Sequence, residues 1–500
     1  MLNDFYKQFK SGTDIRGVAS EGVEGEALNM TNEAVADMTG GFCRWLMDKT
    51  GKTASELTVS VGRDSRISGE RIADVVTKTL SSFGVKVILC NLASTPSMFM
   101  TTVDLGCDGA VQITASHHPF NRNGLKFFTR LGGLEGSDIT AILTNASDKN
   151  FPAITENGTI EEVDYMTQYA EHLCDIIKKG VNAENYDKPL EGFKICVDAG
   201  NGVGGFYADK VLARLGADTN GSRYLDPDGM FPNHVPNPES PVAMKAISEA
   251  VVEAQADLGV IFDTDVDRGA VVDDKGNEIN RNRLVALASA IALEGCEGGT
   301  IVTDSITSDG LREFIEDTLG GKHYRYRRGY KNVIDKAVEL NKEGIPCPLA
   351  IETSGHAAMK ENYFLDDGAY LCTKIIIKAA QLRKEGKTIS DLISTLKEAK
   401  EEKEIRIKIL EEDFRACGER VISELLKYAE ANEGWAIAPD NREGVRVSFG
   451  KENGDGWFLL RLSVHDPIMP LNIESNSEGG CEIILSHLEN FFKTTKGLDI

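Results

Sequence analysis

Residues 57–90, LTVSVGRDSRISGERIADVVTKTLSSFGVKVILC, decide the fold. A short apolar run is followed by a polar turn, an amphipathic helical pattern, a glycine and a second apolar run. This order is typical of half of a βαβ crossover. It recurs in residues 193–218, FKICVDAGNGVGGFYADKVLARLGAD, and in residues 300–329, TIVTDSITSDGLREFIEDTLGGKHYRYRRG. Three such units predict an α/β protein of three α/β/α domains with mixed, largely parallel sheets. Ligands are expected at the carboxyl ends of the strands.

The chain is long enough for several domains, since 500 residues divide into about three to four domains of roughly 100 to 200 residues. The segment IEEVDYMTQYAEHLCDIIKKG, from Ile160, has helical spacing and is predicted to connect the first two units. The charge-dense segment KEAKEEKEIRIKI is predicted to be a second connector. After it, a helix containing FRACGERVISELLKYAE, the strands VRVSFG, WFLLRLSV and LNIES, and a closing helix indicate a smaller α+β domain. The expected domains are residues 1–155, 156–278, 279–398 and 399–500.

The composition argues against several classes of partner. The chain has 55 basic and 78 acidic residues and a net charge of −23, which disfavours binding to a nucleic-acid backbone. No stretch approaches the ~20 apolar residues that cross a bilayer, and the longest candidate, ALASAIAL from Ala286, is too short. The amino terminus is polar and shows no secretory signal, so we expect a cytoplasmic location. The ten cysteines form no CxxC pair or zinc-ligand spacing and are expected to be reduced core residues.

The segment ITASHHPFNRNGLKFF contains a candidate nucleophile. A strand is expected to end at Ile113, and the turn after it presents Ser116, His117 and His118 ahead of Lys126. A serine is a weak nucleophile unless a base or a cation assists it, and both kinds of group occur within a dozen residues here. Taken alone, the motif also fits a polar turn capped by serine.

The segment LGVIFDTDVDRGAVVDD is a candidate metal site. An apolar strand delivers Asp263, Asp265 and Asp267, and carboxylates at alternate positions can converge on one hard cation, for which Mg²⁺ fits best. A calcium-binding EF-hand loop is the nearest alternative, but the motif follows a strand and has Arg268 where that loop requires glycine. A phosphatase with an aspartyl nucleophile in a DxDx(T/V) motif is another alternative, although its fifth position is Asp267 here.

Three further segments, RRGYKNV, IETSGHAAMK and RLSVHDPIMPLNIES, carry polar side chains suited to a sugar phosphate. Glu and Ser can hydrogen-bond vicinal sugar hydroxyls, His can exchange a proton near neutral pH, and Arg can grip a phosphate. The alternative for ETSGH is a strand-to-helix turn with a capping serine. The alternative for RLSVHDPIMPLNIES is an ordinary hairpin turn. The candidate residues are Arg327, Gly329, Tyr330, Lys331, Glu352, Ser354, His356, Arg461, Ser463 and His465.

Taken together, these motifs resemble those of the α-D-phosphohexomutases, from SGTDIRG at Ser11 to NIES near the carboxyl end. TASHHP resembles the active-serine loop of that family, usually TASHNP, and DTDVDR resembles its metal loop, usually DGDGDR. ETSGH is similar to the sugar-binding GExSGH, and RLSVHDP is similar to the phosphate loop RxSxTxP. Four motifs in the same order across nearly the whole chain make this resemblance specific.

The resemblance implies three α/β domains and a smaller carboxyl-terminal domain around a central cleft. It also implies an enzyme, an intramolecular phosphotransferase that interconverts hexose 1-phosphate and hexose 6-phosphate of glucose, mannose or both. The phosphoryl group would reside on Ser116 in the resting enzyme and pass through a hexose 1,6-bisphosphate. The implied cofactors are Mg²⁺ and glucose 1,6-bisphosphate as activator. The expected partners are small-molecule hexose phosphates, without nucleic acid or membrane, and the expected state is a monomer or homodimer.

The resemblance also implies roles for individual residues. The metal would be held by Ser116, Asp263, Asp265 and Asp267. The catalytic residues would be Ser116, His117, Lys126, Arg268 and His356. The substrate-binding residues would be Arg16, Arg327, Gly329, Tyr330, Lys331, Glu352, Ser354, Arg461 and Ser463.

The chain departs from the family pattern at several positions. Thr264 and Val266 replace glycines of the metal loop, His118 replaces an asparagine, and Asp466 adds a negative charge to the phosphate loop. Thr353 occupies the variable position of the sugar loop, where methionine is associated with glucose and mannose phosphates and glutamine with glucosamine phosphate. A phosphoglucosamine mutase, a non-catalytic sugar-phosphate-binding relative and a phosphatase therefore stay open as alternatives.

Overall fold

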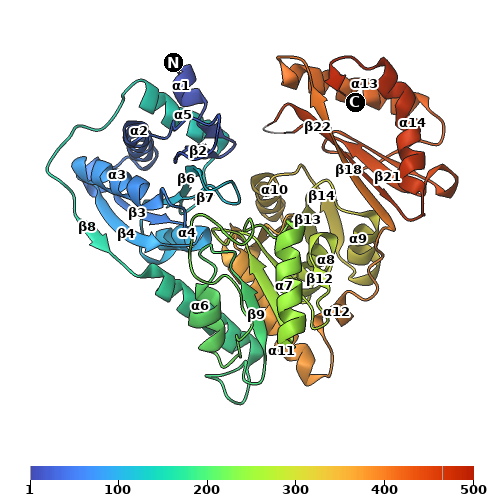
Figure 1. Cartoon of the computed structure of the whole chain (residues 1–500), viewed down its shortest axis with the longest axis horizontal. Coiled ribbons are helices and arrows are strands. Elements are labelled where there is room, and N and C mark those ends of the chain that lie inside the picture. The colour runs from blue at the N-terminus through green and yellow to red at the C-terminus, as the bar shows by residue number, and fades with distance from the viewer. Residues whose placement is uncertain (1, 464–465, 500) are drawn as a thin grey trace. The chain divides into compact units, whose positions relative to one another are not determined.

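The computed structural model describes residues 2–463 and 466–499 (Figure 1). The chain divides into two compact units, which are described in turn. The first unit comprises Met1–Leu284 and Ser354–Asp391, and the second comprises Val285–Thr353 and Leu392–Ile500. The four domain ranges expected from the sequence stay a prediction.

The first unit contains an eight-stranded mixed sheet. Its strands are β1 (Lys10–Ser11), β2 (Asp14–Val18), β3 (Thr58–Arg63), β4 (Lys86–Leu92), β5 (Gly109–Ile113), β6 (Arg122–Thr129), β7 (Gly132–Gly133) and β8 (Ile160–Glu162). They lie in the order β1-β2-β6-β5-β3-β4-β8, with β7 paired to β6. Strands β5, β3, β4 and β8 are parallel, whereas β6 runs antiparallel to both β2 and β5. The predicted end of a strand at Ile113 is confirmed.

Helices cover both faces of this sheet. The helices in this part of the chain are α1 (Asp4–Lys7), α2 (Asn32–Thr50), η1 (Ala54–Glu56), α3 (Gly69–Ser82), α4 (Thr95–Asp104) and α5 (Gly136–Ser147). Side chains of α2, α3 and α5 share one core with Val59 and Val61 of β3. Ser60, between these two valines, hydrogen-bonds Thr101 of α4 instead. Because successive strand residues point to opposite faces, α4 covers the other face.

A second sheet of the first unit carries the aspartate motif. Its strands are β9 (Ile195–Asp198), β10 (Leu258–Phe262), β11 (Gly269–Val272) and β12 (Glu278–Ile279), in the order β12-β11-β10-β9. Strands β9 and β10 are parallel, and β10 and β11 form an antiparallel hairpin. The remaining elements of this unit are α6 (Tyr165–Val181), the π-helical η2 (Tyr207–Ala213), α7 (Pro241–Ala254), β16 (Ala357–Met359), η4 (Lys360–Asn362), β17 (Leu365–Asp366) and α11 (Gly368–Lys384). The helix predicted from Ile160 is confirmed from Tyr165 onward, whereas its first three residues form β8.

The second unit contains the third βα repeat and an antiparallel sheet. Strands β13 (Thr300–Thr303), β14 (Lys322–Arg325) and β15 (Leu349–Ile351) are parallel. The antiparallel sheet has the order β19-β20-β21-β22-β18-β23. Its strands are β18 (Glu401–Ile409), β19 (Ala436–Ile437), β20 (Val445–Phe449), β21 (Gly456–Leu460), β22 (Ile468–Ser475) and β23 (Leu498–Asp499). The other elements from residue 281 onward, outside the first unit's β16 to α11, are α8 (Arg281–Leu293), α9 (Asp309–Glu313), the π-helical η3 (Phe314–Thr318), α10 (Tyr330–Lys342), α12 (Ile389–Leu392), α13 (Phe414–Ala431), η5 (Lys451–Asn453) and α14 (Gly480–Thr494).

The predicted connector at residues 397–409 is wrong, because most of it forms β18. This strand pairs with β22 over eight consecutive residues. Its charged residues at alternate positions are exposed, whereas Ile407 and Ile409 point into the core formed with α13 and α14. A strand with one solvated face can therefore carry many charges, which is why charge density concealed it. The two helices and the strands VRVSFG and LNIES predicted for the rest of this domain are confirmed. The predicted strand WFLLRLSV ends at Leu460, and its last residue, Val464, lies outside the described residues.

In the part of the chain that the structure describes, no helix has the length and apolar character to cross a bilayer.

Candidate active site

The turn between β5 and β6 places Ser116 in a buried position. Its backbone has a φ of 50°, in the left-handed region that residues other than glycine seldom adopt. The Ser116 backbone N–H donates to the Thr114 hydroxyl at 2.9 Å. Its Oγ donates to Asp263 Oδ2 at 3.2 Å. The turn therefore directs the serine side chain toward the aspartate motif.

The β10–β11 hairpin brings the three predicted aspartates together. One carboxylate oxygen from each of Asp263, Asp265 and Asp267 lies within 4.8 Å of the others, and all three residues are buried. Among the described residues, Oδ1 of Asp265 and Oδ1 of Asp267 are buried without a hydrogen-bond partner. Hard divalent cations such as Mg²⁺ bind carboxylate oxygens of this kind, so the donor set fits the metal that the sequence predicts.

The three carboxylates differ in their electrostatic environments. Burial raises the pKa of Asp263 well above its ordinary value, and the neighbouring charge of Asp267 raises it further. Burial also acts to raise the pKa of Asp267, but the charges of Lys126, His356 and Arg268 together outweigh burial, and the net pKa is lowered. Without a cation, the protein therefore disfavours full ionisation of the cluster.

Arg268 links the serine loop to the aspartate loop. This buried guanidinium donates from Nε to Asp263 Oδ2 at 3.0 Å and from Nη1 to Asn237 Oδ1 at 3.2 Å. From Nη2 it donates to Ser116 Oγ at 3.1 Å and to His117 Nδ1 at 2.8 Å. Burial and the Arg268 charge lower the pKa of His117 to about 2, so the neutral ring accepts at Nδ1. The arrangement places positive charge beside the serine hydroxyl.

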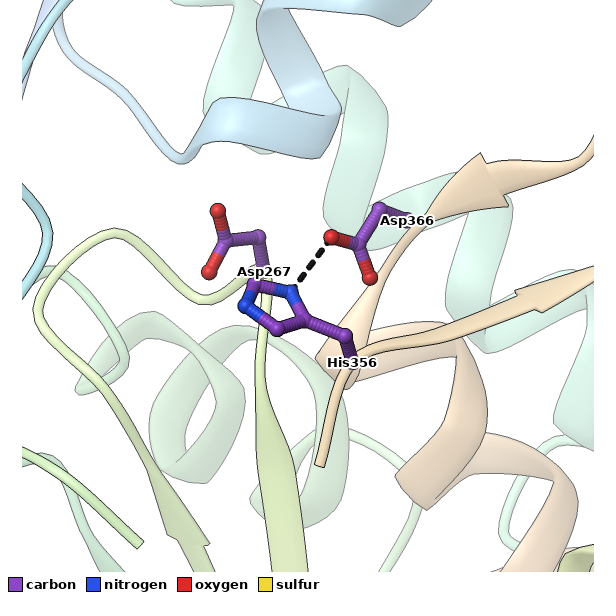
Figure 2. Close-up of side chains that lie close together, drawn as sticks. All are labelled: Asp267, His356 and Asp366. Atoms are coloured by element: carbon purple, nitrogen blue, oxygen red, sulfur yellow. Dashed lines mark hydrogen bonds and ion pairs between the residues drawn. The ribbon is translucent and has the colours of Figure 1, made fainter. Parts of the chain in front are cut away.

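Lys126 and His356 both lie beside Asp267 of the aspartate cluster. Lys126 Nζ donates to Asp267 Oδ2 at 2.7 Å and lies 3.8 Å from Asp265 Oδ2. Figure 2 shows the imidazole of His356 between the carboxylates of Asp267 and Asp366, with Nδ1 donating to Asp366 Oδ2 at 2.5 Å. Burial lowers the pKa of His356, but these two carboxylates outweigh burial and raise it to about 9. His356 is therefore an imidazolium at neutral pH.

Two other predicted residues of the first unit lie on nearby segments. Arg16 of β2 pairs with Gly124 of β6 in the sheet register, and its guanidinium forms an ion pair with Asp14 at 3.0 Å. Its charge contributes to lowering the pKa of His117. Ser354 is buried, and its Oγ has no partner among the residues that the structure describes.

The sugar-loop candidates of the second unit are tied to one another. Glu352, at the end of β15, is buried and accepts from the Gly329 backbone N–H at 2.6 Å. Arg327 Nε donates to a backbone oxygen at 3.4 Å, and Lys331 pairs with an aspartate of its own helix. Tyr330 is the first residue of that helix, α10. The segments RRGYKNV and IETSGHAAMK are thus joined at Glu352.

The phosphate-loop candidates lie between β21 and β22. Arg461 is buried, and its backbone N–H donates to the Pro470 carbonyl oxygen at 3.1 Å. Burial lowers the pKa of Arg461, and its Nε has no partner within the described ranges. The Ser463 backbone N–H donates to Ile468 O at 3.0 Å. His465, also considered from the sequence, lies outside the described residues.

Comparison with family models identifies the family to which these motifs belong. The models described as "Phosphoglucomutase/phosphomannomutase, alpha/beta/alpha domain" I, II and III match residues 8–152, 167–276 and 280–399. The chain belongs to the phosphoglucomutase/phosphomannomutase family. The resemblance to the α-D-phosphohexomutases and the predicted fold class are thereby confirmed.

Relatives of this family match along nearly their full length. A phosphoglucomutase of Neisseria meningitidis serogroup A is 28% identical over 99% of this chain and 96% of its own length. A phosphomannomutase/phosphoglucomutase of Pseudomonas aeruginosa is 29% identical over 96% and 94%. A solved phosphoglucomutase/phosphomannomutase family protein from Burkholderia thailandensis has a TM-score of 0.80 at 25% identity, covering 99% of this chain and 98% of its own.

Several residues that contact the predicted catalytic and metal-binding side chains were not predicted from the sequence. Asp366 binds His356, and the hydroxyl of Thr95 donates to Asp265. Asn237 accepts from Arg268, and Glu239 lies 3.6 Å from the same guanidinium. Asp366 stands in FLDDG directly before a helix, and Asn237 and Glu239 stand in the polar segment PNHVPNPE, but neither segment indicates which side chain its residues contact.

The variable position of the sugar loop also has an unpredicted partner. The Thr353 hydroxyl donates to Asp304 Oδ2 at 2.7 Å, in the second unit. Asp304 is fully buried at the end of β13. The threonine side chain is therefore fixed by the protein itself.

Proposed function

We propose that this protein is a Mg²⁺-dependent phosphohexomutase that interconverts hexose 1-phosphates and hexose 6-phosphates of glucose, mannose or both. The phosphoryl group is carried on Ser116 and passes through a hexose 1,6-bisphosphate. Family membership supports this reaction class, and the curated relatives are named phosphoglucomutase or phosphomannomutase/phosphoglucomutase. Glucose 1,6-bisphosphate acts as the activator by phosphorylating Ser116.

One observation carries the proposal: Ser116 Oγ lies between a carboxylate of the aspartate cluster and a guanidinium. Its distances are 3.2 Å to Asp263 Oδ2 and 3.1 Å to Arg268 Nη2. A capped polar turn does not require its serine to contact both a buried carboxylate of an acidic cluster and a buried arginine. Phosphoryl transfer does, since it depends on placement and on stabilisation of charge at the transferred oxygens.

The aspartates Asp263, Asp265 and Asp267, together with Ser116, would hold Mg²⁺. When bound, the cation supplies positive charge that neutralises the transferring phosphoryl oxygens. Arg268 adds a second positive charge on the same serine oxygen. The neutral Nδ1 of His117 keeps this guanidinium oriented by accepting one of its N–H groups at 2.8 Å.

In the proposed first half-reaction, the bond between phosphorus and Ser116 Oγ breaks as a bond forms between phosphorus and a sugar hydroxyl oxygen. The hydroxyl proton leaves to a general base, and Lys126 is the candidate in its neutral amine form, which becomes the ammonium as it takes the proton. His356 suits the opposite role, because its raised pKa keeps a proton available for the leaving oxygen at neutral pH. In the second half-reaction, the phosphate on the other end of the sugar returns to Ser116.

The remaining candidates bind the substrate. Glu352 and Ser354 hold sugar hydroxyls, and Arg461 and Ser463 hold the phosphate that does not react. Buried Arg461 Nε and Ser354 Oγ, which lack partners among the described residues, are free to meet ligand atoms. We include Arg16, Arg327, Gly329, Tyr330 and Lys331 in the same substrate-binding set. We further propose a cytoplasmic monomer or homodimer.

The test is conversion of glucose, mannose and glucosamine 1-phosphates to 6-phosphates, followed by ³¹P NMR with MgCl₂ and a trace of glucose 1,6-bisphosphate. The variants are Ser116→Ala and, as a matched control, Ser82→Ala, which replaces a serine at the end of α3. We expect the wild type and Ser82→Ala to convert glucose or mannose 1-phosphate, and Ser116→Ala to lose nearly all turnover.

Each alternative gives a different result in this assay. Conversion of glucosamine 1-phosphate alone would identify a phosphoglucosamine mutase. Release of inorganic phosphate as the main product would identify a phosphatase. Undiminished turnover by Ser116→Ala would contradict the phosphoserine mechanism, and binding without conversion by phosphorylated wild type would favour a non-catalytic relative.

A further inference from the structure

The turn after β3 contains a buried arginine that the proposed reaction does not yet use. Arg66 stands in the motif GRDSR and is 1% exposed. It forms an ion pair with Asp64 at 3.2 Å, and both side chains are fully buried. The aromatic ring of Phe231 lies over the guanidinium, with its centroid 5.2 Å from Cζ. An arginine so close to the serine loop could bind a substrate phosphate or could organise the protein, and its contacts decide between these roles.

All five N–H donors of the guanidinium have acceptors inside the protein. Nε donates to Asp64, and each terminal nitrogen donates to two backbone carbonyls of the serine loop. The acceptors are Asp64 Oδ2 at 3.2 Å, Pro119 O at 2.7 Å, Arg122 O at 3.1 Å, His118 O at 2.7 Å and Ser116 O. No donor is left for a phosphate.

Asp64 ties the other backbone group of the nucleophile to the same pair. Asp64 Oδ2 accepts from the Thr114 hydroxyl at 2.7 Å, and that hydroxyl accepts from the Ser116 N–H at 2.9 Å. Arg66 Nη2 donates directly to the Ser116 carbonyl oxygen. The N–H and C=O of Ser116 are thus both held by one buried ion pair, which supports its left-handed backbone.

We propose that Arg66 is a positioning residue for phosphoryl transfer: it holds residues 116–122 in the shape that directs Ser116 Oγ at Asp263 and Arg268. This role rests on the proposed mutase function. It is indirect, because Arg66 acts through the loop backbone and does not bind the substrate. Its loss should therefore lower the rate of the chemical step and leave substrate affinity nearly unchanged.

The test compares Arg66→Met with Arg71→Met in the full-length chain. Arg71 is a matched control, because its guanidinium also donates to two backbone carbonyls, Ala19 O at 2.9 Å and Met30 O at 3.1 Å, neither of which belongs to residues 116–122. We expect Arg66→Met to lose about a hundredfold in kcat, the effect of misplacing a reacting group by about 1 Å, with KM within about threefold of wild type. Arg71→Met should keep kcat within about threefold of wild type.

Two further measurements separate positioning from general loss of structure. Millimolar methylguanidinium should restore part of the kcat of Arg66→Ala, because it can re-form the carbonyl contacts. Arg66→Lys has three donors in place of five and should have a kcat between those of the wild type and Arg66→Met. This variant also provides the test if Arg66→Met does not fold. A raised KM with unchanged kcat in the Arg66 variants would overturn the proposal, because it would mean that Arg66 binds substrate.

Amide hydrogen exchange separates this inference from the proposed function. In Arg66→Lys, exchange should quicken over residues 114–122 and stay unchanged in the β10–β11 hairpin. If the wild type is no mutase but exchange quickens as expected, the proposed function fails while the ordering role of Arg66 stands. Unchanged exchange over residues 114–122 would overturn the ordering role, whatever the activity.

Discussion

Replacing Asp265 by asparagine tests the charge of the aspartate cluster while keeping its shape. Without metal, we expect little change in stability. At an effective dielectric constant of about 20, charges no more than 4.8 Å apart, as in Asp265 and Asp267, repel by about 3.5 kcal/mol or more. Lys126 Nζ, 3.8 Å from Asp265 Oδ2, attracts by about 4 kcal/mol. Asp263 forms its own ion pair with Arg268 at 2.9 Å, so the effects of these two opposite charges on Asp265 largely offset each other. The two remaining effects nearly cancel, and Asp265→Asn should alter the unfolding free energy by at most about 1 kcal/mol.

With Mg²⁺ present, the two proteins should separate. A cation at one hundred times its dissociation constant stabilises the wild type by about 2.7 kcal/mol. Even loss of an outer contact weakens metal binding by about 10- to 100-fold, so loss of a ligand charge should weaken it by about 100-fold or more. The same Mg²⁺ concentration then stabilises Asp265→Asn by only about 0.4 kcal/mol. The gap of about 2 kcal/mol should open only when metal is added.

Urea unfolding in EDTA and in MgCl₂, with isothermal titration calorimetry to obtain the Mg²⁺ affinity, measures both quantities. The matched control is Asp273→Asn, since Asp273 is a buried aspartate just past the end of β11 whose oxygens accept from Asn277 and Ser390. It should lose stability equally with and without Mg²⁺ and keep the wild-type affinity. Equal stabilisation of Asp265→Asn and wild type by Mg²⁺ would refute the metal assignment. A loss of several kcal/mol in EDTA would refute the cancellation of charges.

Three other predictions follow from single positions. Burial raises the pKa of Glu474 from 4.5 to about 8, so the wild type loses up to about 5 kcal/mol of unfolding free energy as pH rises through this range. In urea unfolding, Glu474→Gln should therefore be more stable than the wild type at pH ~9 but not at pH ~5. Parallel stability profiles of the two proteins against pH would contradict this. Gly124→Ala would place a Cβ 2.3 and 2.8 Å from two backbone oxygens and should cost about 1–3 kcal/mol or more of unfolding free energy; an unchanged urea midpoint would contradict the close packing. Asn237→Ala removes a hydrogen-bond acceptor from Arg268 and should lower kcat about tenfold in steady-state assays, with little change in KM. A kcat equal to that of the wild type would show that this contact does not orient the guanidinium.

Local sequence could predict much of the site, because its central groups stand in short motifs at strand ends. The hydrophobic run that ends at Ile113 predicted where the serine turn begins. Asp263, Asp265 and Asp267 could be placed together because alternate residues of one tight turn lie close to one another. Each loop follows a strand that is parallel to its neighbour, so each is expected at the carboxyl edge of its own sheet. The serine and metal loops therefore required only local pattern and one general rule of α/β folds.

The supporting residues could not be predicted, because their partners are distant in sequence and their residue types are common. Asn237 meets Arg268 across 31 positions, and Arg66 meets the serine loop across more than 50. Nothing in an isolated asparagine or arginine indicates such a partner. Strand β18 was missed for a different reason: residues 401–404 are all charged, and charged and apolar residues alternate only from Ile405 onward, so the period of two is short.

Val266 shows how the metal loop keeps its shape without the glycines that the family pattern has there. Its φ of 67° lies in the left-handed region, which costs a β-branched residue on the order of 1–3 kcal/mol. The side chain is fully buried, which contributes about 1.5–3 kcal/mol, and the Val266 carbonyl accepts from the Gly368 N–H at 3.1 Å. A glycine would relieve the strain but lose the burial and gain freedom in the unfolded chain. The two effects are of similar size, so valine can hold the three carboxylates in a fixed loop at little net cost.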